Sequence, residues 1–232
     1  MVVGLAFLAT AIATLFCEAT AVRWSRHRKP HELAWAVSLA MFALASAALA
    51  TGTSTGWDIG VFRAFYLLGA VLNVPWLALG TIYLLAGERT GHRARAVLVF
   101  LSGLAVGVVL VAPTNTPVAG VAIPVGREVF GAFPRILAAV GSGTGALVVF
   151  AGAAWSAWRF ARGTAGGPPK SSAKRSPRSA LTNVLIAAGV LVTSGGGLIQ
   201  GVVGHDEAFT ASLASGIVVI YAGFLVGSTT KK

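Results

Sequence analysis

Charged residues are scarce in this sequence. Only 11% of its 232 residues are Asp, Glu, Lys or Arg, whereas 56% are hydrophobic. Soluble domains carry about 25% charged residues, so this composition excludes an ordinary soluble domain. The mean hydropathy of +0.79 is typical of helices that lie in a lipid bilayer. The sequence therefore predicts an integral protein of the cell membrane, with the bilayer as its first partner.

Cysteine is almost absent as well. The single Cys17 excludes an internal disulfide and any metal site built from several cysteines. It lies within an apolar run, where we expect the thiol to behave as a small buried hydrophobic group.

Lysine and histidine are missing from the interior of the apolar runs. All five lysines and four histidines fall in connections or in the tail, which excludes a retinal Schiff base and argues against haem held by two intramembrane histidines. No GxSxG, HExxH or P-loop motif is present, nor a pair of intramembrane carboxylates. We therefore predict that the protein is not an enzyme and has no cofactor and no metal site. His205, Asp206 and Glu207 are interpreted as a solvated turn, with weak metal binding as the alternative.

Long apolar runs are abundant. Roughly 20 apolar residues cross a hydrocarbon core of about 30 Å, and seven runs approach or exceed that length. They are residues 2–22, 33–52, 62–86, 96–112, 133–158, 180–203 and 208–227. No basic segment precedes the first run, so we interpret it as a retained helix and not as a secretion signal. The prediction is an all-α polytopic membrane protein, a seven-transmembrane-helix bundle that forms a single domain over residues 1–232.

The basic residues predict the orientation of this bundle. A net charge of +11 would suggest a nucleic-acid partner in a soluble protein, but here the basic residues lie between apolar runs and form no such motif. Arg63, Arg127 and Arg135 fall on one side of the predicted membrane, and the other fifteen of the 18 Lys and Arg residues fall on the opposite side. Because cytoplasmic loops are enriched in Lys and Arg, we expect the N-terminus outside and the C-terminus in the cytoplasm, with no nucleic-acid partner.

The run at 62–86 carries a polar stripe. Its members follow steps of three and four, which keeps side chains on one face of a helix: Tyr66, Gly69, Asn73, Trp76, Gly80 and Tyr83. The other faces are aliphatic, so the stripe is expected to face other helices and not lipid. Pro75 predicts a kink. Two interpretations stay open: the stripe packs helices together, or it borders a ligand cavity beside Asn73 and Trp76.

Glu18 lies inside the first run and qualifies as an intramembrane candidate. One interpretation is a carboxylate that snorkels to the inner interface or pairs with a nearby arginine. The other is a proton or cation site. Because Glu18 and Tyr83 lie at similar depths, we predict that Glu18 faces the bundle and hydrogen-bonds to Tyr83.

Glycine clusters mark two further helices. Gly195, Gly196 and Gly197 precede Gln200 by one turn and indicate either close packing or an unwound segment that contacts a substrate. The GSGTG sequence at 141–145 is interpreted as a small-xxx-small helix contact. The candidate ligand-binding residues of the whole chain are Tyr66, Asn73, Trp76, Tyr83, Glu18 and Gln200.

Two connections have distinctive sequences. GTAGGPPKSSAKRSP at 163–177 is expected to be flexible, to contact anionic lipid and, alternatively, to bind a cytoplasmic partner. In the longest outer connection, VAGVAIPVG at 118–126 predicts a short hairpin that covers the outer end of the bundle.

Residues 5 to 160 resemble the N-terminal seven-helix sensory region of bacterial histidine kinases and diguanylate cyclases. The similar features are the basic RWSRHRKP turn after the first run, the start of the third run at Arg63, Tyr66 and Gly69, and its exit through Tyr83 into GERTGHR. No effector domain follows in this sequence, so the resemblance implies that signalling output would pass through a separate protein.

The leading functional hypothesis is therefore a membrane sensor or receptor-like module. It would bind a small or lipophilic ligand and signal to a cytoplasmic partner through its basic loops. A small secondary transporter is the alternative, because helices one to three and five to seven form a faint 3+1+3 repeat. A non-catalytic subunit of a membrane complex is the third.

Overall fold

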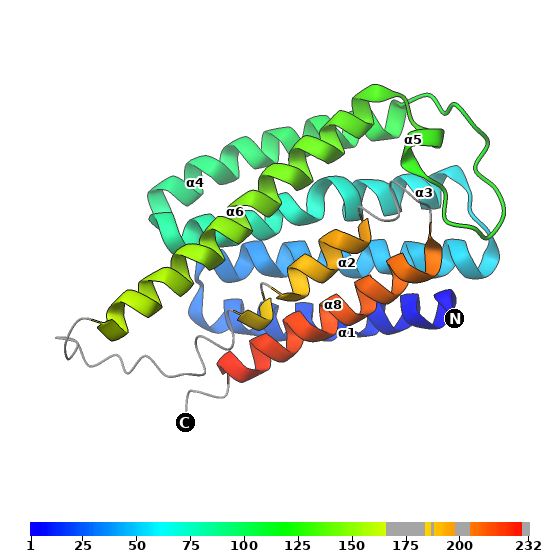
Figure 1. The fold of residues 1–232 in the computed structure, drawn as a ribbon. Helices are drawn as coiled ribbons and strands as arrows, with labels where there is room; N and C mark the ends of the chain where they lie inside the picture. The colour runs from blue at the N-terminus through cyan, green and yellow to red at the C-terminus, as the bar shows by residue number, and fades with distance from the viewer. Residues whose placement is uncertain (166–183, 187, 198–204, 229–232) are drawn as a thin grey trace.

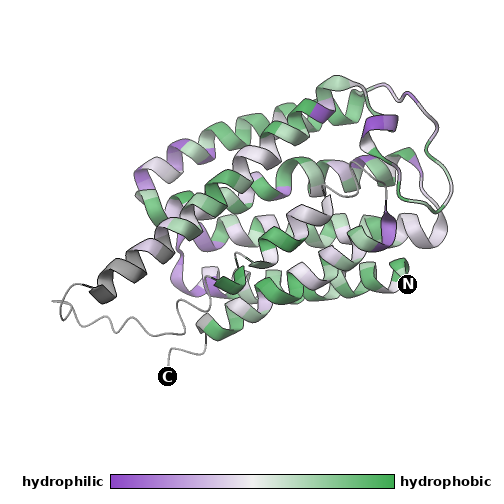
Figure 2. Cartoon of the chain, viewed as in Figure 1, coloured by the Kyte–Doolittle hydropathy of each residue, from purple (hydrophilic) through white to green (hydrophobic). Residues whose placement is uncertain are grey.

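The computed structural model describes residues 1–165, 184–186, 188–197 and 205–228. Over these residues the chain is all-α, and five of its helices are long and apolar enough to cross a membrane. Hydrophilic residues gather at the two ends of the bundle, and hydrophobic residues occupy the middle of the long helices (Figure 2). The chain is thus a helical integral membrane protein that passes the bilayer several times.

Helices α1 (Val2–His27) and α2 (Pro30–Thr55) form an antiparallel pair. The turn between them is short because Arg28 adopts a left-handed conformation, with φ 54°, and donates its N–H to the Trp24 carbonyl. Pro30 then begins α2, at a position where a backbone N–H would have no acceptor within the helix, so proline is tolerated there. Both helices extend beyond the predicted runs at 2–22 and 33–52, so much of the predicted basic loop is helical.

The polar stripe lies on an irregular helix. Asp58 caps α3 (Ile59–Phe65) by accepting from the N–H groups of Gly60 and Val61. A π-helical segment, η1 (Tyr66–Leu72), follows, and the Asn73 N–H donates to the Leu68 carbonyl five residues back. α4 (Asn73–Val111) continues the chain, with Pro75 in its first turn. Because Pro75 has no N–H to donate, the irregularity that the sequence predicts takes the form of a π-helical turn.

Gly87 divides α4 into two arms. Its φ of 82° and ψ of 171° are not helical, and the chain reverses there into an antiparallel hairpin (Figure 1). The Ile59–Val111 stretch of 53 residues therefore corresponds to the predicted runs at 62–86 and 96–112. The predicted connection between these runs, residues 87–95, is helical except for the bend, which corrects the expected loop.

The α5 end of the bundle, which we name after its short helix α5 (Gly126–Val129), carries the longest described connection. The hairpin predicted over 118–126 does not form. Thr114 instead bridges to Phe130, and the Asn115 N–H donates to the Val129 carbonyl at 2.9 Å. Two prolines inside the predicted hairpin sequence or beside it remove ladder donors, which explains why pairing occurs outside it.

The remaining helices close the bundle into a ring. α6 (Ala132–Ala165) packs on α4, and α8 (Asp206–Ser228) packs on α1. The apolar helix Val184–Gly197 joins them: Val190 packs with Ala78 and Val149, and its Gly189 meets Gly216 of α8. All seven predicted runs are helical wherever the structure describes them, except at Ala112, which follows the last residue of α4. The number that cross the membrane stays a prediction.

Candidate functional site

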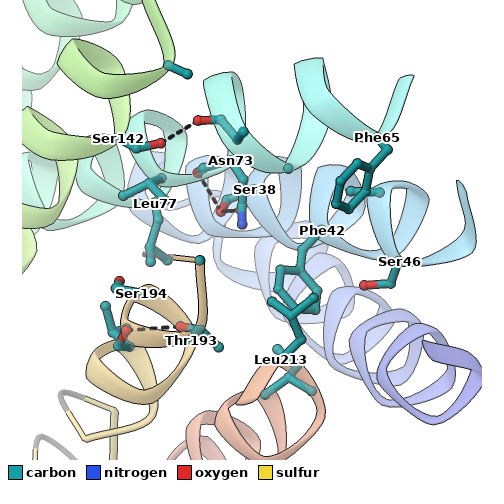
Figure 3. Close-up of a pocket in the computed structure, with 18 of the residues that line it drawn as sticks. Ser38, Phe42, Ser46, Phe65, Asn73, Leu77, Ser142, Thr193, Ser194 and Leu213 are labelled. Carbon is teal, nitrogen blue, oxygen red and sulfur yellow. Dashed lines mark hydrogen bonds between the residues drawn. The ribbon is translucent and has the colours of Figure 1, made fainter. Parts of the chain in front are cut away.

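A cavity of about 920 Å³ lies inside this ring. Its walls come from α1, α2, the α3–η1–α4 stretch, α6, Val184–Gly197 and α8, and most of the lining side chains are apolar (Figure 3). Phe42 and Phe65 line it from one side and Leu213 of α8 from another. This volume falls within the range of about 300–1,000 Å³ that small-molecule sites occupy.

Asn73 forms part of the cavity wall, and its orientation is fixed by α2. Ser38 Oγ lies 2.7 Å from Asn73 Oδ1, to which it donates, and 3.0 Å from the Asn73 carbonyl (Figure 3). Ser38 is 2% exposed, so this bond lies in the interior. The amide is thereby held in one orientation, as ligand-positioning polar groups in apolar sites commonly are.

Two of the other polar groups in the cavity wall are directed at the backbone. Ser142 Oγ of α6 donates to the Ala70 carbonyl, and Thr193 Oγ1 donates to the carbonyls of Gly189 and Val190. A hydroxyl whose proton is used in this way offers its surroundings little beyond an acceptor lone pair. The middle of the cavity is consequently more apolar than its Ser and Thr residues suggest.

The α5 end of the cavity is charged. Arg127 of α5 and Arg135 of α6 both line it, beside Tyr66. The Tyr66 ring lies directly on Gly126, where any side chain would collide with it, and packs edge-on against Phe130 at 5.0 Å. Glycine at 126 therefore allows α5 to approach η1 closely enough for Arg127 to reach the cavity.

The predicted stripe faces neighbouring helices, but it serves two different surfaces. Tyr66 and Asn73 line the cavity. Trp76 and Tyr83 face the second arm of α4, where Trp76 Nε1 donates to Ser102 Oγ at 3.2 Å. Gly80 faces α2, and Trp35 occupies the space that a side chain at Gly80 would need. Trp76 and Tyr83 thus pack helices together, whereas Tyr66 and Asn73 border the cavity, whose use as a ligand site stays a prediction.

The predicted hydrogen bond between Glu18 and Tyr83 is wrong. Glu18 is exposed on α1 and does not line the cavity, whereas the Tyr83 hydroxyl shares a 2.9 Å hydrogen bond with His92 Nδ1. The reason is the Gly87 bend, which brings His92 back to the depth of Tyr83. A carboxylate near the end of a transmembrane helix and on its outer surface agrees with the snorkelling interpretation.

Gln200 and the three glycines before it were also candidates for ligand contact. Gln200 lies outside the described residues. The nearby glycines are helical as far as Gly197, and Gly196 packs against Ser212 of α8 so closely that no side chain would fit. Gly196 therefore supports close packing, whereas the neighbouring Gly197 lines the cavity.

Glu32 is a buried carboxylate that sequence reasoning missed. Its side chain is only 4% exposed, and its two oxygens lie 3.5 Å from Arg23 and 3.7 Å from Nδ1 of His27. Arg23 also lies over the Phe224 ring of α8 at 5.0 Å, so the cluster joins three helices at the Gly87 end. The signal was present in the sequence, because a tight turn at Pro30 leaves Glu32 in the first turn of α2 beside the end of α1.

Asp206, within the HDE cluster, has a structural role at the start of α8. Asp206 begins α8, and its Oδ2 accepts from the Ile123 N–H at 3.0 Å, which fastens the long α5-end connection to α8. Among the described residues no group of three or more His, Cys, Asp or Glu side chains is placed to hold a metal ion.

The chain is thus a helical integral membrane protein with a mainly apolar cavity among its helices. Comparison with protein-family models, with curated proteins and with solved structures gives no match. The function is therefore argued from the site itself.

Proposed function

We propose that this protein is a seven-helix membrane sensor or receptor-like module that binds a lipophilic small molecule in the central cavity. The observation that carries this proposal is the cavity of about 920 Å³, which is lined by residues of all the long helices and is mostly apolar. A ligand there would touch several helices at once, so its binding would favour one arrangement of the bundle over another.

The Gly87 end offers a route for output. Phe16 and Phe224 line the cavity and lie 4.9 Å apart, and Phe224 also lies under the Arg23 guanidinium, which pairs with Glu32. A ligand that displaces Phe224 would therefore disturb the contact between α8 and the α1–α2 turn. We further propose that this end faces the cytoplasm, because most Lys and Arg residues lie on its side, and that it signals to a separate protein. The resemblance to bacterial seven-helix sensory regions supports the same proposal.

The proposal is tested by ligand-dependent thermal stability of the purified protein against lipids and small lipophilic metabolites. Ala138→Phe places a ring in the cavity wall and should abolish the stabilisation given by any compound that binds there. Ala151→Phe adds the same ring at an exposed position on α6 and is the matched control. If no compound stabilises the protein, or if both variants respond like the unchanged protein, the cavity is not a ligand site.

A small secondary transporter is the second candidate, because the same cavity has lining residues near both ends of the bundle. Glu18, the candidate proton or cation site for such a function, does not line the cavity. Uptake into proteoliposomes separates the two functions: flux above that of empty liposomes, reduced by Ala138→Phe, favours transport. Flux equal to that of empty liposomes, together with ligand-dependent stabilisation, favours the sensor. A non-catalytic subunit of a membrane complex would show neither and would co-purify with its partners.

A further inference from the structure

The lining of the cavity changes from charged at one end to mostly apolar toward the other, and this change indicates the chemistry of a matching ligand. Arg127 and Arg135 line its α5 end. Toward the Gly87 end most of its lining is aromatic or aliphatic, with Phe16, Leu77, Ile220 and Phe224 beside the hydroxyls of Thr20 and Thr81. Between these ends, Ser142 and Thr193 donate to backbone carbonyls. A ligand that matches this site is therefore apolar over most of its length and negatively charged at one end.

The cavity is long enough for an acyl chain. On α6 its lining residues extend from Arg135 to Val149, which are 14 residues apart and hence separated by about 21 Å of helix. One leaflet of a hydrocarbon core is about 15 Å thick, so a single extended acyl chain of ordinary length fits beside α6. Branched or disc-shaped ligands would leave part of this length empty.

Basic residues are rare at the α5 end of the bundle. Only three of the 18 Lys and Arg residues fall on this side of the predicted membrane, and two of them line the cavity. The third is Arg63, whose guanidinium donates a hydrogen bond of 2.7 Å to the Ala112 carbonyl at the end of α4. Arg127 is 51% exposed and lies 3.9 Å from the exposed carboxylate of Glu128. Arg135 is exposed as well.

We propose that the cavity binds a single-chain amphiphile with an anionic head group. The acyl chain occupies the apolar length, and the carboxylate or phosphate lies beside Arg127 and Arg135, where the Tyr66 hydroxyl is an additional donor. This inference rests on the proposed function, because it names the ligand of the same cavity. Charge-assisted hydrogen bonds to guanidinium groups are among the stronger polar contacts in proteins, so the head group should dominate selectivity.

Binding of three radiolabelled probes to the full chain in a non-ionic detergent tests the proposal. The probes are palmitate, a lysophosphatidylglycerol with the same acyl chain, and hexadecanol, which has the chain without the charge. At least one anionic probe should bind about tenfold or more tightly than hexadecanol. Stronger binding of palmitate identifies a carboxylate head group, and stronger binding of the lysolipid identifies a phosphate head group. Both outcomes support the proposal.

The variants make the test specific. Arg127→Gln combined with Arg135→Gln should remove the preference for the anionic probe, and the corresponding pair of Lys substitutions should retain most of it. Arg93→Gln combined with Arg95→Gln removes the same charge from exposed positions at the Gly87 end and should change nothing. Arg135→Gln alone, at an exposed position, keeps the test decisive if the double variant does not fold, because it should reduce the preference.

Two results would overturn the proposal in distinguishable ways. Equal binding of hexadecanol and the anionic probes, sensitive to Ala138→Phe but not to the arginine variants, would leave a ligand cavity without charge recognition. Binding of none of the probes, with other compounds stabilising the protein through the cavity, would show that the ligand is not an acyl amphiphile. If no compound of any kind responds to Ala138→Phe, the proposed function itself fails.

Discussion

The Tyr83 hydroxyl and His92 Nδ1 lie 2.9 Å apart, on opposite sides of the bend at Gly87. The Tyr83 ring also covers Gly91, where any side chain would collide with it. A polar pair and a close aromatic contact thus hold the two arms of α4 together at the point where the chain reverses. The bend is therefore defined by contacts across it as well as by the glycine conformation.

Removing this hydroxyl should weaken the hairpin modestly. Hydrogen bonds in membrane proteins average about 0.6 kcal/mol in double-mutant cycles, so Tyr83→Phe should lower the free energy of unfolding in detergent by about that amount. The loss should vanish in a His92→Ala background, and it should persist in a Glu18→Gln background. Strictly additive effects of Tyr83→Phe and His92→Ala would show that the pair contributes nothing. Tyr221→Phe, which retains the ring contacts with Phe16 and Phe224, is a control.

The two glutamates of the α1–α2 pair should respond differently to neutralisation. Glu32→Gln leaves Arg23 and His27 without the buried carboxylate that they share, and it should lower the free energy of unfolding by about 1–3 kcal/mol. This is less than the loss of a fully buried ion pair would cost, because Arg23 is 39% exposed and solvent screens its charge. Glu18→Gln, on the exposed surface of α1, should be close to neutral. Chemical unfolding in detergent measures both changes. Equal effects would contradict the assignment of Glu32 as the structural carboxylate.

The glycines of the GSGTG sequence should also differ from one another. A Cβ at Gly145 would lie 3.0 Å from the backbone of Val74 and Pro75, whereas the space around Gly143 is open. Gly145→Ala should therefore separate α6 from α4 and cost about 1–3 kcal/mol. Gly143→Ala should be neutral or slightly stabilising, because alanine favours the helix by about 1 kcal/mol. Thermal stability of the two variants gives the comparison, and a reversed order would show that α6 does not pack here.

Orientation in the membrane can be tested with cysteines at the two ends of the bundle. In a Cys17→Ala background, Thr116→Cys at the α5 end should react with a membrane-impermeant thiol reagent in intact cells. Glu88→Cys at the bend should react only after the membrane is permeabilised. Both positions are exposed, so protection at either one reports the membrane and not burial. The opposite labelling pattern would put the Gly87 end outside and remove the proposed contact with a cytoplasmic partner.

The helices themselves follow from the sequence, because long apolar runs have few alternatives in a bilayer. The stripe on 62–86 was correctly predicted to face other helices. Which helix each residue faces was not predictable, because the spacing rule assumes 3.6 residues per turn along the whole run. The π-helical turn at Tyr66–Leu72 adds a residue to the local turn and rotates the rest of the helix, so Asn73 faces α2 while Trp76 reaches Ser102.

The ends of the helices explain the other differences. The predicted runs exclude the charged residues that flank them. α2 begins three residues before its predicted run, so Glu32 lies in the helix and not in the predicted loop. Of the six candidate ligand-binding residues, Tyr66 and Asn73 line the cavity, Trp76, Tyr83 and Glu18 do not, and Gln200 lies outside the described residues. Arg127 and Arg135 come from connections or helix starts that meet at the α5 end, and no local pattern relates them to η1. Such residues are brought together by tertiary packing, which periodicity along one run does not describe.

The Gly87 bend also bears on the order in which the protein assembles. Tyr83 and His92 are nine positions apart in the chain, and the reversal between them takes a single residue. Closing so short a loop costs little chain entropy, so contacts of this kind form early. Both arms of α4 are available before α6 has been synthesised, and we expect them to enter the bilayer as a preformed pair. α8, which completes the cavity through contacts with α1, can join only after α6 has been synthesised, so the cavity forms later than the α4 hairpin.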